Sequence, residues 1–395
     1  MTKLIRSSRI ETIDLLRGVV MVIMALDHVR DYFALGSFFM DPTDLKITTP
    51  ALFFTRFITH FCAPVFVFLT GTSAFLWGNT KTKSQLFKFL FTRGIWLIFL
   101  ELTVNTFLWT FDITYSMIVM QVIWAIGLSM VVLSGLIFLP RKILLVVGII
   151  LIAFHNLLDS IVADGTGLGS FLWYLLHQQK IIQTGPQSLI LIQYPVLPWI
   201  GVMVTGYCFG TLYAKGADVL LRRKVLLISG TVGLIMFFIF RGTNIYGDLS
   251  PWETQKDVVF TILSFFNVTK YPPSLSYVLV TLSPAMLFLL YMESVKNRVT
   301  DFFIVFGRVP LFYYFAHVFI IHIFALLGMA LAGDDWQRMI LTGTGFMEKS
   351  LADYGYPLWT VYLLWLAVVL MLYPFCKKYM IYKSDNNHKW WLSYL

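Results

Sequence analysis

Ionisable side chains recur on one face of the first apolar segment, where their types and spacing could support acid–base chemistry. Asp14, Arg17, His28 and Asp31 are separated by steps that fit helical turns, so a helix would place them within a face roughly 100° wide. His28 stands far enough beyond Asp14 to lie about 21 Å further along a helix axis. An imidazole can accept a proton, and the carboxylate of Asp27 or Asp31 could fix its tautomer. The alternative is a polar clamp between helices; we favour chemistry because carboxylates flank the histidine.

Further polar residues interrupt other apolar segments of the chain. Such groups are costly in hydrocarbon, so each is a functional candidate. Arg56 and His60 are spaced four residues apart, as are Glu101 and Asn105. We expect the side chains of Arg56, His155 and His322 to extend toward the membrane interface, so that their polar ends reach water. The remaining candidates in or beside apolar segments are Gln121, Lys270, Tyr271 and His317.

The composition excludes a water-soluble globule. The 395 residues are 58% hydrophobic and only 13% charged, about half the charged fraction of an ordinary soluble domain. The mean hydropathy of +0.76 also excludes a disordered chain, so we expect a protein that lives in a bilayer. The cysteines Cys62, Cys208 and Cys376 lack the paired spacing of zinc sites or disulfide frameworks, and we therefore expect no metal site.

Apolar windows long enough to cross a membrane recur along the whole chain. About 20 residues are needed for a helix to cross the hydrocarbon core. The segments 171–176 and 258–267 are too short to cross and are typical of interfacial or re-entrant pieces, which leaves an eleventh span open. We therefore predict an all-α polytopic membrane protein with about ten transmembrane helices. The windows are 12–35, 52–77, 88–110, 116–138, 142–159, 194–214, 224–241, 275–293, 302–331 and 357–378.

Basic residues between the windows predict the orientation. Placing Lys3, Arg6 and Arg9 inside puts most of the other loop Lys and Arg residues on the same side, so both termini are predicted to be cytoplasmic. The net charge of +9 is then explained by the basic residues that orient the protein in the membrane and attract anionic lipid. It gives no support for nucleic-acid binding. We predict a single domain over residues 1–395, with extracytoplasmic loops at 160–193, 242–274 and 332–356, in an integral membrane protein of the bacterial cytoplasmic membrane.

Three motifs carry a family resemblance. The first reads Arg9-Ile-Glu-Thr-Ile-Asp-Leu-Leu-Arg-Gly18 and continues to Met24-Ala-Leu-Asp-His28. The second is Ala63-Pro-Val-Phe-Val-Phe-Leu-Thr-Gly-Thr-Ser73, and the third is Lys270-Tyr-Pro-Pro-Ser274. Together they resemble the transmembrane acyltransferases related to heparan-alpha-glucosaminide N-acetyltransferase. The resemblance implies transfer of an acetyl group from cytosolic acetyl-CoA to an acceptor on the far side of the membrane.

One departure from the family bears on the catalytic base. The animal enzymes carry Asn where Asp27 stands, and their catalytic histidine comes slightly later, in the following loop. This chain has no histidine there, so His28 or His60 would have to replace it. Transfer could be direct or pass through an acyl-histidine intermediate, and both routes use the same residues.

Acyl transfer needs a base, a donor for the developing oxyanion and a group that holds the thioester, and the candidate residues could supply each. Arg17, oriented by Asp14 and assisted by Arg93, would meet the phosphates of CoA. His28, oriented by Asp27 or Asp31, would remove the proton of the acceptor while Asn105 or Gln121 donates to the carbonyl oxygen. The candidate catalytic residues are thus His28, Asp27, Asp31, His60 and Asn105, and the candidate cofactor-binding residues are Asp14, Arg17 and Arg93. The candidate substrate-binding residues are Glu101, Gln121, Lys270, Tyr271 and His317.

The expected partners follow from this function. They are acyl-CoA, an extracytoplasmic glycan or other small acceptor, membrane lipid and, as an open alternative, a second copy of the chain. A proton-coupled secondary transporter is the main rival, since it too would place His, Asp and Glu inside spans broken by Pro and Gly. Against it stand the lack of a visible internal repeat and the gathering of polar groups toward one leaflet. A non-catalytic scaffold would leave the cost of the buried charges unexplained.

Overall fold

Long apolar runs without polar breaks fold into helices throughout this protein. The computed structural model describes residues 10–386 and 388–393, and 68% of the chain is helical. Lys3, Arg6 and Arg9, on which the predicted orientation partly depends, lie outside the described residues. The helices of the first half are α1 (Glu11–Phe33), α2 (Pro50–Thr59), α3 (Cys62–Gly78), α4 (Lys83–Leu100), α5 (Thr106–Thr110), α6 (Val122–Leu136), α7 (Arg141–Ala153), α8 (Leu168–Leu176) and α9 (Leu197–Phe209).

The second half continues the helical pattern and adds short helices in its loops. A π-helical turn, η1 (Glu101–Asn105), joins α4 to α5, and 3-10 turns include η2 (His155–Leu158) after α7 and η4 (Trp336–Met339) after α14. The helices of the second half are α10 (Val219–Thr243), α11 (Val258–Phe266), α12 (Leu275–Met292), α13 (Arg298–Arg308), α14 (Pro310–Leu331), α15 (Gly343–Met347) and α16 (Leu358–Asp385).

Each of the ten apolar windows overlaps a helix of the structure, and within the described residues five stretches are long and apolar enough to cross a membrane. They include α2 with α3 as one stretch, and α10, α12, α14 and α16. The short segments at 171–176 and 258–267 form α8 and α11, each nine residues long. The total number of spans and the side on which the termini lie stay predictions.

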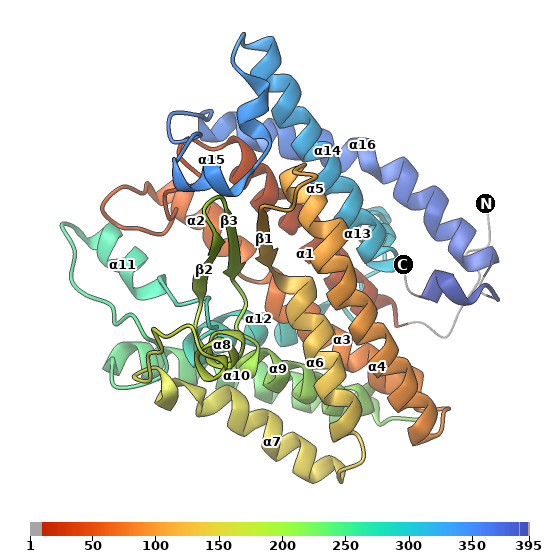
Figure 1. Cartoon of the computed structure of the whole chain (residues 1–395). Helices are drawn as coiled ribbons and strands as arrows, with labels where there is room; N and C mark the ends of the chain where they lie inside the picture. The colour runs from red at the N-terminus through yellow and green to blue at the C-terminus, as the bar shows by residue number, and fades with distance from the viewer. Residues whose placement is uncertain (1–9, 387, 394–395) are drawn as a thin grey trace.

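A three-stranded sheet corrects the all-α prediction. Strands β1 (Met117–Met120) and β3 (Ser188–Ile192) are parallel, with Val119 opposite Leu191, and β2 (Lys180–Gly185) pairs with β3 in an antiparallel hairpin. The strands lie within a predicted loop and at the start of a predicted helical window. A scan for 20-residue apolar windows cannot detect strands of four to six residues. Figure 1 shows the strands side by side near the middle of the view, with α15 above them and α7, α9 and α10 below.

Helix α1 is the central element, and it packs against α2, α3, α12, α13, α14 and α16. Its closest neighbour is α13, because glycines let the two backbones touch. A Cβ atom built on Gly18 would lie 1.9 Å from the carbonyl oxygen of Phe303, and one built on Gly307 would lie 1.9 Å from that of Asp14. This approach brings the polar face of α1 against the end of α13 and the start of α14.

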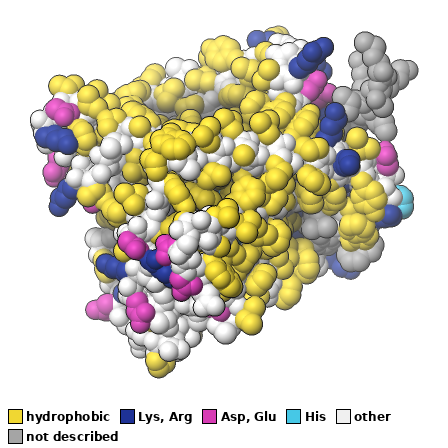
Figure 2. Space-filling view, turned by 90° about the horizontal axis from the view of Figure 1, so that it is seen from above, with side chains coloured by type: hydrophobic (Ala, Val, Ile, Leu, Met, Phe, Trp, Pro, Cys, Tyr) yellow, Lys and Arg dark blue, Asp and Glu magenta, His cyan; other side chains and the backbone are white. Residues whose placement is uncertain are grey.

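Large hydrophobic side chains cover much of the outer surface. Only 28% of the most apolar window of α10 and 22% of that of α16 is buried within the protein. In Figure 2 a broad hydrophobic area crosses the face seen from above, and charged side chains gather in separate groups beside it. Helices that are apolar on their outer face are stable in hydrocarbon and not in water. The chain is therefore an integral membrane protein.

Candidate active site

A cavity of about 240 Å³ lies beside the last two turns of α1. Its walls come from the end of α1, from Arg56 on α2, from the sheet, and from the loops that precede α12 and follow α14. Most of the predicted site residues near this end of α1 line it: Asp27, His28, Asp31, Gln121, Lys270 and Tyr271. The other described lining residues that the site uses are Arg30, Trp109, Gln193 and Tyr194.

His28 forms a hydrogen-bonded pair with His317 of α14, and this pair defines the protonation of both rings. His317 Nδ1 lies 2.7 Å from the carbonyl oxygen of Tyr313, which can only accept a hydrogen bond. In a neutral His317 ring Nε2 is therefore the acceptor, and His28 Nδ1, at 2.8 Å, must donate to it. The lone pair of His28 then lies on Nε2. His28 is buried with 8% of its surface exposed, and it lines the cavity, so it is arranged to accept a proton there.

Aromatic rings hold the His28 imidazole in place. Trp109 and Tyr314 approach it edge-on, with ring centroids 4.8 and 5.7 Å away. The indole nitrogen of Trp109 also donates to the hydroxyl of Tyr314 at 3.3 Å. These contacts leave the imidazole little freedom to rotate, which favours a preorganised base.

The carboxylates beside His28 bind arginines, whereas we had expected them to orient the histidine. Asp27 accepts two hydrogen bonds from Arg56 Nη1, at 2.7 and 3.0 Å, and one from Thr59 Oγ1 at 2.8 Å. Arg30 lies 2.9 Å from Asp27 and also pairs with Asp31. Arg56 is therefore a largely enclosed partner of Asp27, with 12% of its side chain exposed, and our prediction that it extends to the interface is wrong. The reason is that α2 ends beside α1, so that Arg56 finds a carboxylate inside the protein.

Cationic groups outnumber anionic groups in the cavity wall. Arg30 is buried, and its Nε and Nη1 atoms have no hydrogen-bond partner among the described residues. Lys270 is also buried, with Nζ 5.2 Å from the ring centre of Tyr271. Burial alone would raise the pKa of Tyr271, but the nearby Lys270 and Arg56 outweigh it and lower that pKa below its usual value. Negative charge that develops in this cavity would therefore be stabilised.

Three predicted site residues serve the packing around the cavity and do not line it. Glu101 accepts hydrogen bonds from Asn105 Nδ2 and from the backbone nitrogens of Gln121 and Trp124, each at 3.0 Å. A carboxylate at this place satisfies the free N–H groups at the start of α6. His60, at the break between α2 and α3, packs against Tyr277, whose hydroxyl donates to the His60 carbonyl at 2.8 Å.

A second polar cluster lies at the opposite end of α1. Arg17 donates to Ser73 Oγ at 2.9 Å and to the Gly307 carbonyl at 3.3 Å, and its guanidinium lies 3.3 Å from Asp14. Arg308 lies 3.4 Å from the other carboxylate oxygen of Asp14. The cluster thus joins α1, α3 and α13 with two guanidinium groups around one carboxylate. Arg93 lies on α4, with its guanidinium 5.7 Å from the ring centre of Phe89.

The two polar ends of α1 are separated by packed side chains. Arg17 and His28 are about 17 Å apart along the helix. The cavity is lined by no residue of α1 before Asp27. Met21 and Met24, which share the polar face, are only 1% and 5% exposed. The predicted face of α1 is therefore polar at both ends, with buried methionines between them.

Sequence reasoning missed several parts of this site. The ion pair of Arg30 with Asp27 could have been predicted, because Arg30 follows Asp27 by three residues on the same helix. His322 was predicted to reach the interface, but it is fully buried, with Nε2 2.9 Å from the Met339 carbonyl and Nδ1 3.0 Å from that of Leu108. The place of Gln193 and Tyr194 in the cavity wall could not be predicted, because the strand that precedes them was not recognised.

Comparison with known proteins places these residues in a family. No curated protein matches the chain. Residues 9–242, more than half of the chain, match the catalytic family of heparan-alpha-glucosaminide N-acetyltransferase. The matched range contains His28, Asp27, Arg56 and Gln121, and ends before His317. On this match, the chain belongs to the heparan-alpha-glucosaminide N-acetyltransferase catalytic family, and is an acetyltransferase of the membrane.

Proposed function

We propose that this protein transfers an acetyl group from cytosolic acetyl-CoA to a hydroxyl or amine of an extracytoplasmic acceptor, a sugar, with His28 as the general base. The observation that carries the proposal is the His28–His317 pair, which leaves the basic nitrogen of His28 at a cavity rich in cations. His60 has no such relation to the cavity, so we choose His28 between the two histidines. Family membership favours this function over the secondary transporter.

The proposed step is a direct transfer. His28 Nε2 takes the proton of the acceptor as the acceptor's oxygen or nitrogen attacks the thioester carbonyl carbon. Lys270 and the Gln121 carboxamide, which line the cavity, stabilise the resulting oxyanion together with the positive charge of Arg30. The C–S bond then breaks, and the thiolate of CoA receives the proton held by His28. His317 acts as a positioning residue throughout.

We place the phosphates of acetyl-CoA at the opposite end of α1. The Asp14, Arg17 and Arg308 cluster supports this, because two guanidinium groups face one carboxylate and leave a net positive charge. Arg93 stays a predicted contributor. The acyl arm would then run along α1 and displace the side chains of Met21 and Met24, which are unbranched and flexible. The cytoplasm is the natural side for this end, since it holds the donor.

The test is acetyl transfer by the purified full-length protein in vesicles, with radiolabelled acetyl-CoA as donor and methyl α-glucosaminide as the first acceptor of a panel of amino and neutral sugars. His28→Ala should lower kcat by about 10²–10⁴-fold while acetyl-CoA binding persists. The matched control is His388→Ala, because His388 is exposed. Transfer at the wild-type rate by His28→Ala would exclude His28 as the base, and loss of transfer in His60→Ala alone would assign that role to His60.

A further inference from the structure

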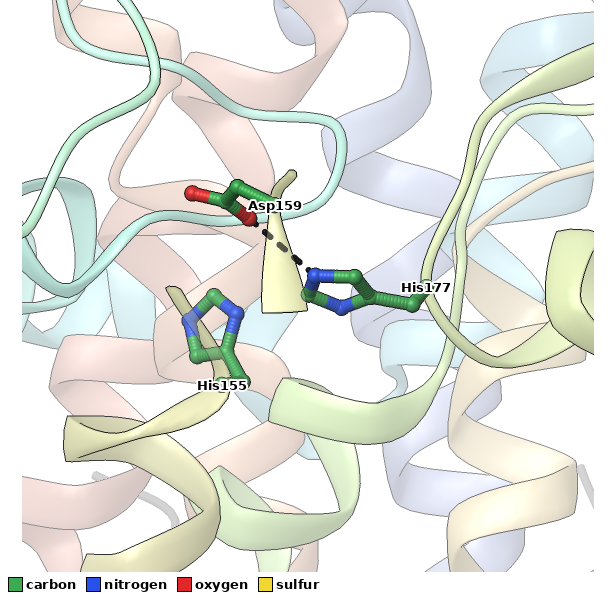
Figure 3. Close-up of side chains that lie close together, drawn as sticks. All are labelled: His155, Asp159 and His177. Atoms are coloured by element: carbon green, nitrogen blue, oxygen red, sulfur yellow. Dashed lines mark hydrogen bonds and ion pairs between the residues drawn. The ribbon is translucent and has the colours of Figure 1, made fainter. Parts of the chain in front are cut away.

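Two histidines and one aspartate meet at a place that the transfer reaction does not use. His155 lies on η2, Asp159 directly follows this turn, and His177 directly follows α8. Figure 3 shows the three side chains converging, with the imidazole of His177 directed at the carboxylate of Asp159. None of the three lines the cavity beside His28. They therefore form a separate cluster.

The spacing of the donor atoms fits a metal ion. His177 Nε2 lies 3.1 Å from Asp159 Oδ1, and one ligand atom of each of the three residues lies within 4.8 Å of the others. In a tetrahedral zinc site with bonds of about 2.1 Å, two ligand atoms are about 3.4 Å apart. His177 and Asp159 already have this spacing. A ring nitrogen of His155, which lies within 4.8 Å of both, would have to move closer to complete the set.

The two imidazoles are deeply buried without enough hydrogen-bond partners. His155 is 2% exposed and His177 is 3% exposed. Among the described residues, no well-formed hydrogen bond reaches either ring nitrogen of His155 or the Nδ1 atom of His177. The backbone of Pro273 is close to the His155 ring, but it satisfies at most one of the two ring nitrogens. Burying unpaired polar atoms is unfavourable, and a bound cation would supply the missing partner for His155. This observation is independent of the spacing.

An outer partner orients the carboxylate, as is usual around protein metal sites. Asn156 Nδ2 donates to Asp159 Oδ2 at 2.8 Å, which leaves Oδ1 directed at His177. The carbonyl oxygen of the same Asn156 side chain accepts from the backbone nitrogen of Leu275 at 2.9 Å. The cluster is thus connected to the start of α12.

We propose that His155, Asp159 and His177 bind a divalent first-row transition metal, with Zn²⁺ as the best fit. Two imidazoles and one carboxylate are ligands that Zn²⁺ accepts, and three protein ligands leave one tetrahedral position for water. The prediction that this chain lacks a metal site considered cysteine spacing alone. Cysteine spacing cannot reveal a site that is built from two histidines and one aspartate.

The position of the site gives the metal a supporting role. It would fasten η2 to the end of α8, and α8 leads into the β2–β3 hairpin that is followed by Gln193 and Tyr194 of the cavity wall. Through Asn156 it would also fasten the start of α12, directly after the loop that carries Lys270 and Tyr271. The metal would thus hold two walls of the cavity in register without touching the reacting groups.

The test is the metal content of purified full-length protein, measured by mass spectrometry, followed by Zn²⁺ titration of the chelator-stripped protein. We expect one Zn²⁺ per chain, a rise of Tm on Zn²⁺ addition, and loss of both in His155→Gln, Asp159→Asn and His177→Gln. His388→Gln and Asp164→Asn are matched controls, because both residues are exposed and outside the cluster, and they should bind Zn²⁺ like wild type. Asn156→Ala should weaken Zn²⁺ binding by about 10–100-fold.

Two outcomes would overturn the proposal. One is a folded wild-type protein that binds no Zn²⁺ in a saturable one-to-one titration, which would make His177 and Asp159 an ordinary buried hydrogen-bonded pair. The other is wild-type Zn²⁺ affinity in the three ligand variants, which would place the metal elsewhere. The wild-type titration decides the first outcome even where a ligand variant fails to fold.

Discussion

The role assigned to His317 can be tested by changing only its ability to accept a hydrogen bond. His317→Leu removes the acceptor for His28 Nδ1, now 2.8 Å away. His317→Gln keeps an acceptor near the same place, because the side-chain oxygen of Gln can occupy the position of Nε2. Removing one buried hydrogen bond costs about 1–3 kcal/mol, and each 1.36 kcal/mol corresponds to a factor of ten in rate. We therefore expect kcat to fall about 5- to 150-fold in His317→Leu.

The split between kcat and KM separates positioning from binding. His317 does not line the cavity, so KM for acetyl-CoA and for the acceptor should stay near the wild-type values in both variants. His317→Gln should recover most of the lost kcat. The assay is the same labelled acetyl transfer, with size-exclusion profiles and thermal midpoints as folding controls. The reasoning is refuted if His317→Leu keeps wild-type kcat, or if both folded variants lose kcat to the same extent.

Two further predictions concern stability. Gly307→Ala should lower the free energy of unfolding by about 1–3 kcal/mol, because the added Cβ would lie 1.9 Å from the Asp14 carbonyl oxygen. The control is Gly135→Ala, which has no neighbouring atom within 4 Å and should be neutral or slightly stabilising. Equal thermal midpoints of the two variants would contradict the close contact of α1 and α13. Burial would raise the pKa of Asp112, but hydrogen bonds from Ser116 and Thr114 outweigh it and lower that pKa. In the unfolded chain the pKa of an aspartate is about 4, so the Asp112 carboxylate should stabilise the folded protein above about pH 4. This stabilisation should be lost as the pH falls through the lower pKa that Asp112 has in the folded protein. Asp112→Asn should therefore lower the thermal midpoint at pH 7 and weaken its dependence on acid, and an unchanged midpoint would show that these hydrogen bonds contribute nothing.

The helical framework could be predicted because apolar length alone marks it. Periodicity also placed His28 on the same face of the first helix as Asp14, Arg17 and Asp31, since a helix repeats every 3.6 residues regardless of its neighbours. The partner of His28 could not be predicted, because His317 lies 289 residues away and only the packing of α14 on α1 brings it close. Adjacent carboxylates were the natural guess, but Arg56 and Arg30 bind them.

The remaining differences also have tertiary causes. Glu101 and Asn105 look functional from the sequence because both are polar within an apolar run. The structure shows that Glu101 satisfies backbone N–H groups at the start of α6, a contact that forms only because α4 and α6 pack together. The short strands escaped detection because they are only four to six residues long.

The two buried methionines of α1 bear on a difficulty that the proposed transfer across the bilayer would have to solve. A water-filled passage from Arg17 to His28 would short-circuit the ion gradients of the cell and expose the thioester to hydrolysis. Met21 and Met24 are buried within that interval, and their thioether side chains form no strong hydrogen bonds that must be broken before they move aside. In the proposed reaction, the same two side chains would then block ions and water when no donor is bound and move aside when the acyl arm of acetyl-CoA enters.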